Sequence, residues 1–292
     1  MGQNPSLPTL KFILLFAGCI FLGMSLGVAL TMLVKFWMQN GNSWYTSITI
    51  LAVNHLSIYL IPALAYWYWF ESATWKDFNR RSFNSVSALS AGILSGIVLL
   101  PFNGILINWN KGIVFADVFS GIEQWMIQKD QANNVLMTKL MDFTALDQLF
   151  ITLIVSALIA AVGEEIFFRG IIQSKLIQGT KSVHSGVWLS AILFSAIHLQ
   201  FFGFFPRLVL GALFGYLYVF SGNLWVAILA HFINNALFIL TKYMEHQSIN
   251  DDLNFHFPLD SWLIGACSLI SSILLLIYFR KKNGDFSSKV HF

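Results

Sequence analysis

Residues 12–34 form the apolar stretch FILLFAGCIFLGMSLGVALTMLV, which contains no charged side chain. At about 1.5 Å per residue, a helix of this length crosses the roughly 30 Å hydrocarbon core of a bilayer. The stretch lacks a short apolar core followed by a small-residue cleavage site, so we expect a retained span and not a signal peptide. It predicts a membrane protein built from helices.

The rest of the composition agrees with a membrane protein. Hydrophobic residues make up 57% of the chain and charged residues 11%, against about 25% charged in soluble domains. The turn signals Phe205-Pro206-Arg207 and Ser221-Gly222-Asn223 divide the long apolar block in the second half of the chain. We therefore predict an all-α polytopic bundle of about eight transmembrane helices, at residues 12–34, 46–70, 86–108, 146–168, 185–204, 206–221, 223–241 and 261–279.

The basic residues give the predicted orientation. With eight spans, 11 of the 17 Lys and Arg residues fall on the side that holds both termini. The positive-inside rule then places both termini in the cytoplasm, and we expect a bacterial plasma membrane. The net charge of +3 follows from these flanks and indicates no nucleic-acid partner. The residues on that side are Lys11, Lys76, Arg80, Arg81, Arg169, Lys175, Lys181, Arg280, Lys281, Lys282 and Lys289.

The chain divides into three parts by its spans. Residues 1–145 hold three spans and an outer segment, 146–242 a four-helix core, and 243–292 a last span and a cytoplasmic tail. Within the outer segment, apolar residues recur at helical spacing over 109–145, which predicts one or two amphipathic helices that serve as a lid or as a connector. The glycine pairs 23/27, 92/96 and 211/215 allow close helix packing, which we expect inside the chain and not between copies.

Three polar motifs interrupt the predicted spans of the core. An ionisable side chain inside a membrane span is costly and marks a functional site by default. Two carboxylates, two imidazoles and a carboxamide from three spans can together activate water, which indicates a hydrolase. The motifs are Glu164-Glu165-Ile166-Phe167-Phe168-Arg169, Phe194-Ser195-Ala196-Ile197-His198 and His231-Phe232-Ile233-Asn234-Asn235.

The two glutamates cannot have the same role. Adjacent residues on a helix point about 100° apart. Glu165 precedes Arg169 by four residues, a favourable ion-pair spacing, so we expect Glu165 to hold Arg169. Glu164 then faces the bundle interior as a candidate general base. The alternative is a stop-transfer boundary whose charges reach toward water.

The two histidine motifs also allow both a functional and a structural interpretation. His198 is predicted to lie well inside the fifth span, as part of the site or as a hydrogen-bonded core residue. His231 and Asn235 are one turn apart on one helix face, where they form an oxyanion hole, bind a metal, or make a polar helix contact. Asn234 is a second candidate for that contact. Counted from the cytoplasmic ends of their spans, Glu164 and both histidines lie in the same half of the membrane.

In order and spacing, the motifs closely resemble those of the CPBP family of intramembrane proteases, also called the CAAX-protease or Abi family. Its eukaryotic members are the type II CAAX-prenyl endopeptidases, and its bacterial members include bacteriocin-processing and bacteriocin-immunity proteins. The resemblance covers roughly residues 146–242. The family pattern is EExxxR, FxxxH and HxxxN, met here by Glu164, Glu165, Arg169, Phe194, His198, His231 and Asn235.

The resemblance implies hydrolysis of a peptide bond in a membrane-associated substrate, prenylated or otherwise bound to the membrane. The implied catalytic residues are Glu164, Glu165, Arg169, His198, His231 and Asn235. Glu164 and His198 would activate water, while His231 and Asn235 would stabilise the oxyanion. Because the family is usually classed with metalloproteases, a zinc ion held by Glu164, His198 and His231 is implied; a metal-free glutamate mechanism also stays open.

Other functions fit parts of the pattern. A non-catalytic membrane-binding or immunity protein would keep the motifs without turnover. A proton-coupled transporter would use the same groups as a relay, but such carriers usually show internal repeats, and we find none. A haem or quinone protein would use His198 and His231, which leaves the carboxylates unexplained. His55, beside Asn54 in the second span, is expected to be a polar packing residue, with a peripheral substrate contact as the alternative.

Overall fold

The computed structural model describes residues 9–38, 43–71, 74–79, 86–113, 120–248 and 262–283. The secondary structure in these ranges consists of helices, with no strand, which confirms the predicted all-α bundle. The elements are α1 Thr9–Trp37, α2 Trp44–His55, η1 Leu56–Leu60, α3 Ile61–Phe70, α4 Trp75–Phe78, α5 Val86–Val98, α6 Leu100–Lys111, α7 Ser120–Leu140, α8 Leu146–Thr152, η3 Leu153–Ile159, α9 Ala160–Glu165, η4 Ile166–Gln173, α10 Ser174–Thr180, α11 Val183–Ala196, η5 Phe201–Gly203, α12 Phe204–Ser221, α13 Leu224–Ser248 and α14 Trp262–Asn283.

Seven helical segments among the described residues are long and apolar enough to cross a membrane. The fifth predicted span, 185–204, is instead the 14-residue helix α11, about 21 Å long at 1.5 Å per residue. The seven segments are Leu10–Trp37, Trp44–Phe70, Val86–Lys111, Leu146–Thr180, Phe201–Ser221, Leu224–Gln247 and Trp262–Lys282.

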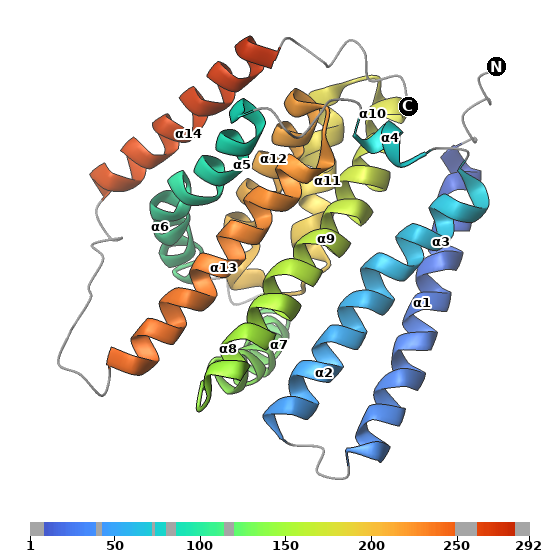
Figure 1. The fold of residues 1–292 in the computed structure, drawn as a ribbon, viewed down its shortest axis with the longest axis vertical. Helices are drawn as coiled ribbons and strands as arrows, with labels where there is room; N and C mark the ends of the chain where they lie inside the picture. The colour runs from blue at the N-terminus through green and yellow to red at the C-terminus, as the bar shows by residue number, and fades with distance from the viewer. Residues whose placement is uncertain are drawn as a thin grey trace.

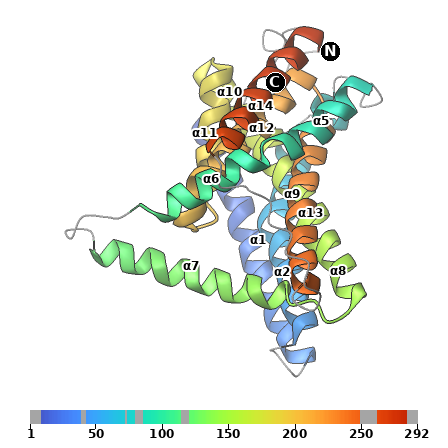
Figure 2. The same ribbon diagram turned by 90° about the vertical axis from the view of Figure 1, so that its left-hand side faces the viewer.

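The helices form one bundle with α7 lying across it. In Figure 1, α1 and the α2–α3 segment run side by side along one edge, while α13 passes beside α9 in the middle. The start of α1 and the end of α14 lie at the same end of the bundle. Figure 2 shows α7 running across the other helices instead of along them. The site described below is therefore enclosed by helices from both halves of the chain.

The predicted amphipathic segment is one helix over most of its length. Its last turn is attached to α2, because Trp44 Nε1 donates to the Leu140 carbonyl at 3.1 Å. Nearer its start, the Trp125 ring lies 5.2 Å from the Phe201 ring. Residues 114–119, which carry the first apolar positions of the predicted pattern, lie outside the described residues. The contact at Phe201 brings α7 to the loop that follows α11.

Glycines allow the close helix contacts that the sequence predicted. A Cβ added at Gly96 would lie 2.7 Å from the Ala230 carbonyl oxygen, so α5 and α13 pack backbone to backbone there. A Cβ at Gly23 would clash with the Ser57 carbonyl oxygen, and one at Gly215 would lie 2.5 Å from Gln173 Oε1. Each of these approaches is internal, which confirms packing inside the chain.

The break between the fifth and sixth predicted spans lies earlier than expected. The helix α11 ends at Ala196, and Leu199 adopts the left-handed conformation at φ 51°, which reverses the chain. Pro206, expected to mark the turn, lies in the first turn of α12, where proline is tolerated. Asn110 fixes the new turn: its Nδ2 donates to the Phe201 carbonyl at 3.1 Å and its Oδ1 accepts from Phe205 N at 3.0 Å.

Candidate active site

The two glutamates lie in the middle of one long helical segment, Leu146–Thr180. Two π-helical stretches, η3 and η4, flank the short α9 that carries the pair. The helix continues past the predicted span end near Arg169, and the Arg169 side chain is only 1% exposed. The stop-transfer alternative fails for the same reason: the guanidinium has its partners within the bundle and does not reach toward water.

One carboxylate oxygen of Glu165 accepts hydrogen bonds from two side chains. Its Oε1 accepts from Arg169 Nη1 at 2.9 Å, which confirms the predicted pair, and from His231 Nδ1 at 2.8 Å. The carboxylate is fully buried, and its Oε2 has no hydrogen-bond partner. Glu165 thereby joins its own helix to α13, a contact that the sequence did not indicate.

Arg169 continues this connection to α11 and α12. Its Nη2 donates to the Gly211 carbonyl at 3.0 Å, and its Cζ lies 4.6 Å from the centre of the Phe194 ring. A guanidinium over an aromatic face is stabilised by the ring quadrupole, most strongly where water is excluded. The first residue of the FxxxH motif thus serves as a platform for the last residue of the EExxxR motif.

Glu164 faces three imidazoles. Its Oε2 lies 4.0 Å from His198 Nε2 and 3.9 Å from His231 Nε2, and its Oε1 lies 3.3 Å from His55 Nε2. The structure therefore brings together the three residues that were expected to converge, and adds His55. The side chains of Glu164 and His231 are 5% and 6% exposed, whereas those of His55 and His198 are 21% and 24% exposed. The two accessible histidines mark the mouth of the site.

The hydrogen bonds of two histidines determine which ring nitrogen carries the proton. His198 Nδ1 lies 2.7 Å from the Phe194 carbonyl oxygen, and His231 Nδ1 lies 2.8 Å from Glu165 Oε1. Both oxygens only accept, so each Nδ1 carries the proton. In the neutral ring the lone pair is then on Nε2, the atom that faces Glu164. This is the tautomer needed to accept a proton or to bind a metal.

His198 reaches the site from a turn and not from inside a span. It follows the end of α11 and immediately precedes the left-handed Leu199, so the prediction that placed it deep in a continuous span is corrected. Its ring lies 5.2 Å from the Phe194 ring one turn earlier, the contact that the motif spacing predicted. His231 is more enclosed, with its ring stacked on Phe214 at 4.9 Å.

Asn235 lies one turn beyond His231 on α13. Its side chain bonds to the neighbouring helical segment η3 and not to Glu164 or the histidines. Its Nδ2 donates to the Ser156 carbonyl in η3 at 3.3 Å. The carboxamide is half-buried, while the adjacent Asn234 is buried. In this arrangement Asn235 makes the polar helix contact that the sequence left open, and any role on an oxyanion requires it to exchange that bond.

His55 is the site residue that the sequence analysis missed. It was expected to form a polar packing pair with Asn54, but Asn54 Oδ1 instead accepts from Thr31 Oγ1 at 3.3 Å. His55 comes from α2, far from the motifs in sequence. The signal that could have found it is the same one used for the glutamates: an ionisable group inside a predicted span.

The donor types at the site suit zinc, but their positions do not form a metal site. Zinc holds nitrogen and oxygen ligands at about 2.0–2.2 Å. Among the residues that the structure describes, no group of three or more His, Cys, Asp or Glu side chains is arranged to hold a metal ion. The chemistry proposed below is therefore derived from protein groups alone.

Comparisons with known proteins point to the same part of the chain. Residues 146–237 match the model of the family "Type II CAAX prenyl endopeptidase Rce1-like". Two Bacillus subtilis (strain 168) proteins are similar over 102 residues. The uncharacterized protein YpbD is 31% identical, over 34% of this chain and 47% of its own length. The putative membrane peptidase YdiL is 29% identical, over 33% and 41%.

The matched part of the chain spans less than half the length of these two relatives. No solved structure matches the chain significantly. The match nevertheless contains all three motifs, and the structure brings their glutamates and histidines to one place. Residues 146–237 of this polytopic helical membrane protein thus resemble the CAAX-type proteases of the CPBP family.

Proposed function

We propose that the protein is an intramembrane endopeptidase in which Glu164 and His198 activate water. One observation carries the proposal: Glu164 Oε2 lies 3.9 Å and 4.0 Å from two imidazole Nε2 atoms. These separations are too long for direct hydrogen bonds, yet one water can contact the carboxylate and an imidazole together. The family match and the similarity to a putative membrane peptidase support the same activity.

The chemical step follows from the acceptors at this position. Water gives a proton to Glu164 Oε2 while His198 Nε2 accepts its second hydrogen bond, and the oxygen attacks the carbonyl carbon of the peptide bond. The C–O bond forms as the C=O π electrons move to the carbonyl oxygen. When the C–N bond breaks, the proton held by Glu164 passes to the leaving amine, which restores the carboxylate.

His231 and Asn235 are the proposed donors to the oxyanion. Because His231 Nδ1 already donates to Glu165, its Nε2 can donate only when the ring carries both protons. Asn235 would turn its Nδ2 from the Ser156 carbonyl toward the substrate. Preorganised donors of this kind typically contribute about 10²–10³-fold to the rate.

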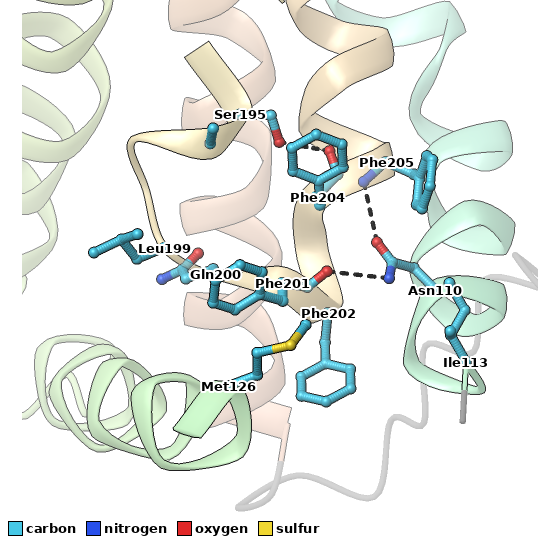
Figure 3. Close-up of a pocket in the computed structure, with 11 residues that line it drawn as sticks. Asn110, Ile113, Met126, Ser195, Leu199, Gln200, Phe201, Phe202, Phe204 and Phe205 are labelled. Atoms are coloured by element: carbon cyan, nitrogen blue, oxygen red, sulfur yellow. Dashed lines mark hydrogen bonds between the residues drawn. The ribbon is translucent and has the colours of Figure 1, made fainter. Parts of the chain in front are cut away.

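A cavity lined by residues that flank His198 in the sequence supports an apolar substrate. It has a volume of about 410 Å³ and lies between the α11–α12 turn, the end of α6 and the amphipathic helix α7 (Figure 3). Leu199 comes from the turn, Phe204 from the start of α12, and Met126 from α7. We propose that this cavity holds an apolar side chain of a membrane-associated peptide or protein. A prenylated peptide, the substrate class in the name of the matched family, is the first candidate to test.

The activity is tested directly with purified protein in liposomes. We expect a library of apolar membrane peptides, with and without a prenyl group, to yield cleaved fragments that mass spectrometry identifies. Fragments with a free carboxyl group at one fixed position would establish an endopeptidase. A wild-type protein that cleaves neither prenylated nor unmodified peptides would favour the non-catalytic alternative.

Metal removal tests the mechanism. We expect cleavage to be unchanged after dialysis against a strong chelator, because water activation here needs only Glu164 and His198. The measurement compares turnover and zinc content before and after dialysis. Loss of turnover that stoichiometric zinc restores would contradict the metal-free step and support a zinc ion held by Glu164, His198 and His231.

The orientation in the membrane is proposed from the basic flanks: both termini in the cytoplasm of a bacterium, and α7 outside. A cysteine replaces Gly179 or Gly121 in a chain with Cys19→Ala and Cys267→Ala. A Cβ at either glycine would meet no heavy atom within 4 Å, so neither change should disturb the fold. We expect a membrane-impermeant thiol reagent added to intact cells to label Gly121→Cys but not Gly179→Cys. The reverse pattern would invert the proposed topology.

A further inference from the structure

His55 occupies a special position relative to Glu164. It is the last residue of α2, directly before the π-helical stretch η1, and it lies outside residues 146–237 that match the family. Its Nε2 is 3.3 Å from Glu164 Oε1, and its ring lies 5.7 Å from the Tyr59 ring one turn later. π-helical turns frequently occur at functional sites. A segment from the N-terminal helices thus contacts the proposed base directly.

The two oxygens of Glu164 have different neighbours. Oε2 faces the Nε2 atoms of His198 and His231, while Oε1 faces His55 alone among the three imidazoles. A carboxylate only accepts hydrogen bonds, so a neutral His55 can bond to Oε1 only with its proton on Nε2. When neutral, the other two rings carry their proton on Nδ1 and present lone pairs to Glu164. His55 is therefore the imidazole of the three that can donate to Glu164 when all are neutral.

We infer that His55 is a positioning residue for the reaction: its Nε2–H occupies Glu164 Oε1 and aims Oε2 at the attacking water. This inference rests on the proposed function. A buried carboxylate without a donor would be free to rotate, and either oxygen could then bind the water in a geometry that does not attack. Holding one oxygen with a neutral donor fixes the rotamer and leaves the other oxygen as the proton acceptor.

Two amides of different length test this role. In glutamine the terminal nitrogen is as many bonds from Cα as Nε2 is in histidine, so His55→Gln can still donate to Oε1. His55→Asn is one bond shorter and cannot reach. We expect His55→Gln to keep kcat within about threefold of wild type and His55→Asn to lose about 10- to 100-fold in kcat with KM unchanged, as when an orienting hydrogen bond is removed elsewhere.

His246→Gln is the matched control, because His246 is a surface histidine bonded to Asp142 at 3.0 Å. It should leave kcat and KM as they are. Equal activity in His55→Gln and His55→Asn, whether high or low, would overturn the inference. The two amide side chains differ only in whether they are long enough to reach Glu164 Oε1. A loss in His55→Asn that appears in KM instead of kcat would make His55 a substrate contact and would overturn it too.

The contact is also tested without activity. Thermal unfolding of His55→Ala, Glu164→Ala and the double variant forms a double-mutant cycle. We expect the loss in Tm of the double variant to be smaller than the sum of the single losses, because both single changes remove the same contact. Additive losses would show that the residues do not interact. A wild type that cleaves no peptide would instead remove the proposed function, and the cycle keeps that failure separate from a missing contact.

Discussion

Replacement of Glu164 by glutamine is expected to abolish peptide cleavage while the protein still inserts and folds. Glutamine has nearly the same shape as glutamate, and its amide oxygen can still accept from His55 at the position of Oε1. It cannot take a proton from water at neutral pH. General-base catalysis typically contributes about 10²–10⁴-fold, so we expect turnover to fall by about 10³-fold or more.

The measurement is cleavage of one identified peptide by equal amounts of folded protein. Glu245→Gln is the matched control: the same change at an exposed carboxylate that pairs with Lys242 at 2.6 Å. It should leave turnover unaltered. Near wild-type turnover in Glu164→Gln would remove the general-base assignment, and with it the step on which the proposed function depends.

The second large effect is expected at the buried pair of Glu165 and Arg169. Their side chains are 0% and 1% exposed, and removal of one partner from a buried pair typically costs about 3–5 kcal/mol because a charge is left unpaired. We expect Arg169→Ala and Glu165→Ala each to lower the thermal stability in detergent strongly and to reduce expression. Glu165→Ala should be the more damaging, because His231 Nδ1 loses its acceptor as well.

The exposed ion pair of Lys242 and Glu245 serves as the control for the buried pair. Lys242→Ala and Glu245→Ala break an ion pair whose side chains are 41% and 55% exposed, and such pairs contribute about 0–1 kcal/mol. Melting curves followed by circular dichroism should separate the two pairs clearly. Variants of Glu165 and Arg169 that melt like wild type but no longer cleave would show that the pair acts in catalysis and not in holding the bundle together.

The parts of the fold that depend on local physics were predictable from the sequence. Span positions follow from the length of apolar stretches, and the Glu165–Arg169 pair follows from helical geometry. The convergence of Glu164, His198 and His231 was also expected, since their depths agreed. Catalytic roles for these residues, and for Asn235, stay predictions that the variants above will test.

The structure differs from the predictions at features that local sequence patterns do not encode. The early end of α11 depends on the left-handed Leu199, a conformation that leucine rarely adopts and that hydropathy does not indicate. The continuation of the helix beyond Arg169 depends on partners in α11, α12 and α13, whose contacts offset the free-energy cost of burying a guanidinium. The contact of His55 with Glu164 joins distant segments, and no spacing rule connects them.

The two π-helical stretches on either side of Glu164 have a consequence for insertions and deletions. A π turn contains about one residue more than an α turn, so η3 absorbs one residue without turning the helix that follows it. Loss of a single residue from η3 would therefore restore regular α geometry and leave Glu164 facing the three histidines. Loss of a residue from the regular turns of α8 has no such outlet and would turn Glu164 by about 100° relative to the preceding turns. The segment thus accepts a one-residue change of length in its π-helical stretches and not in its regular turns.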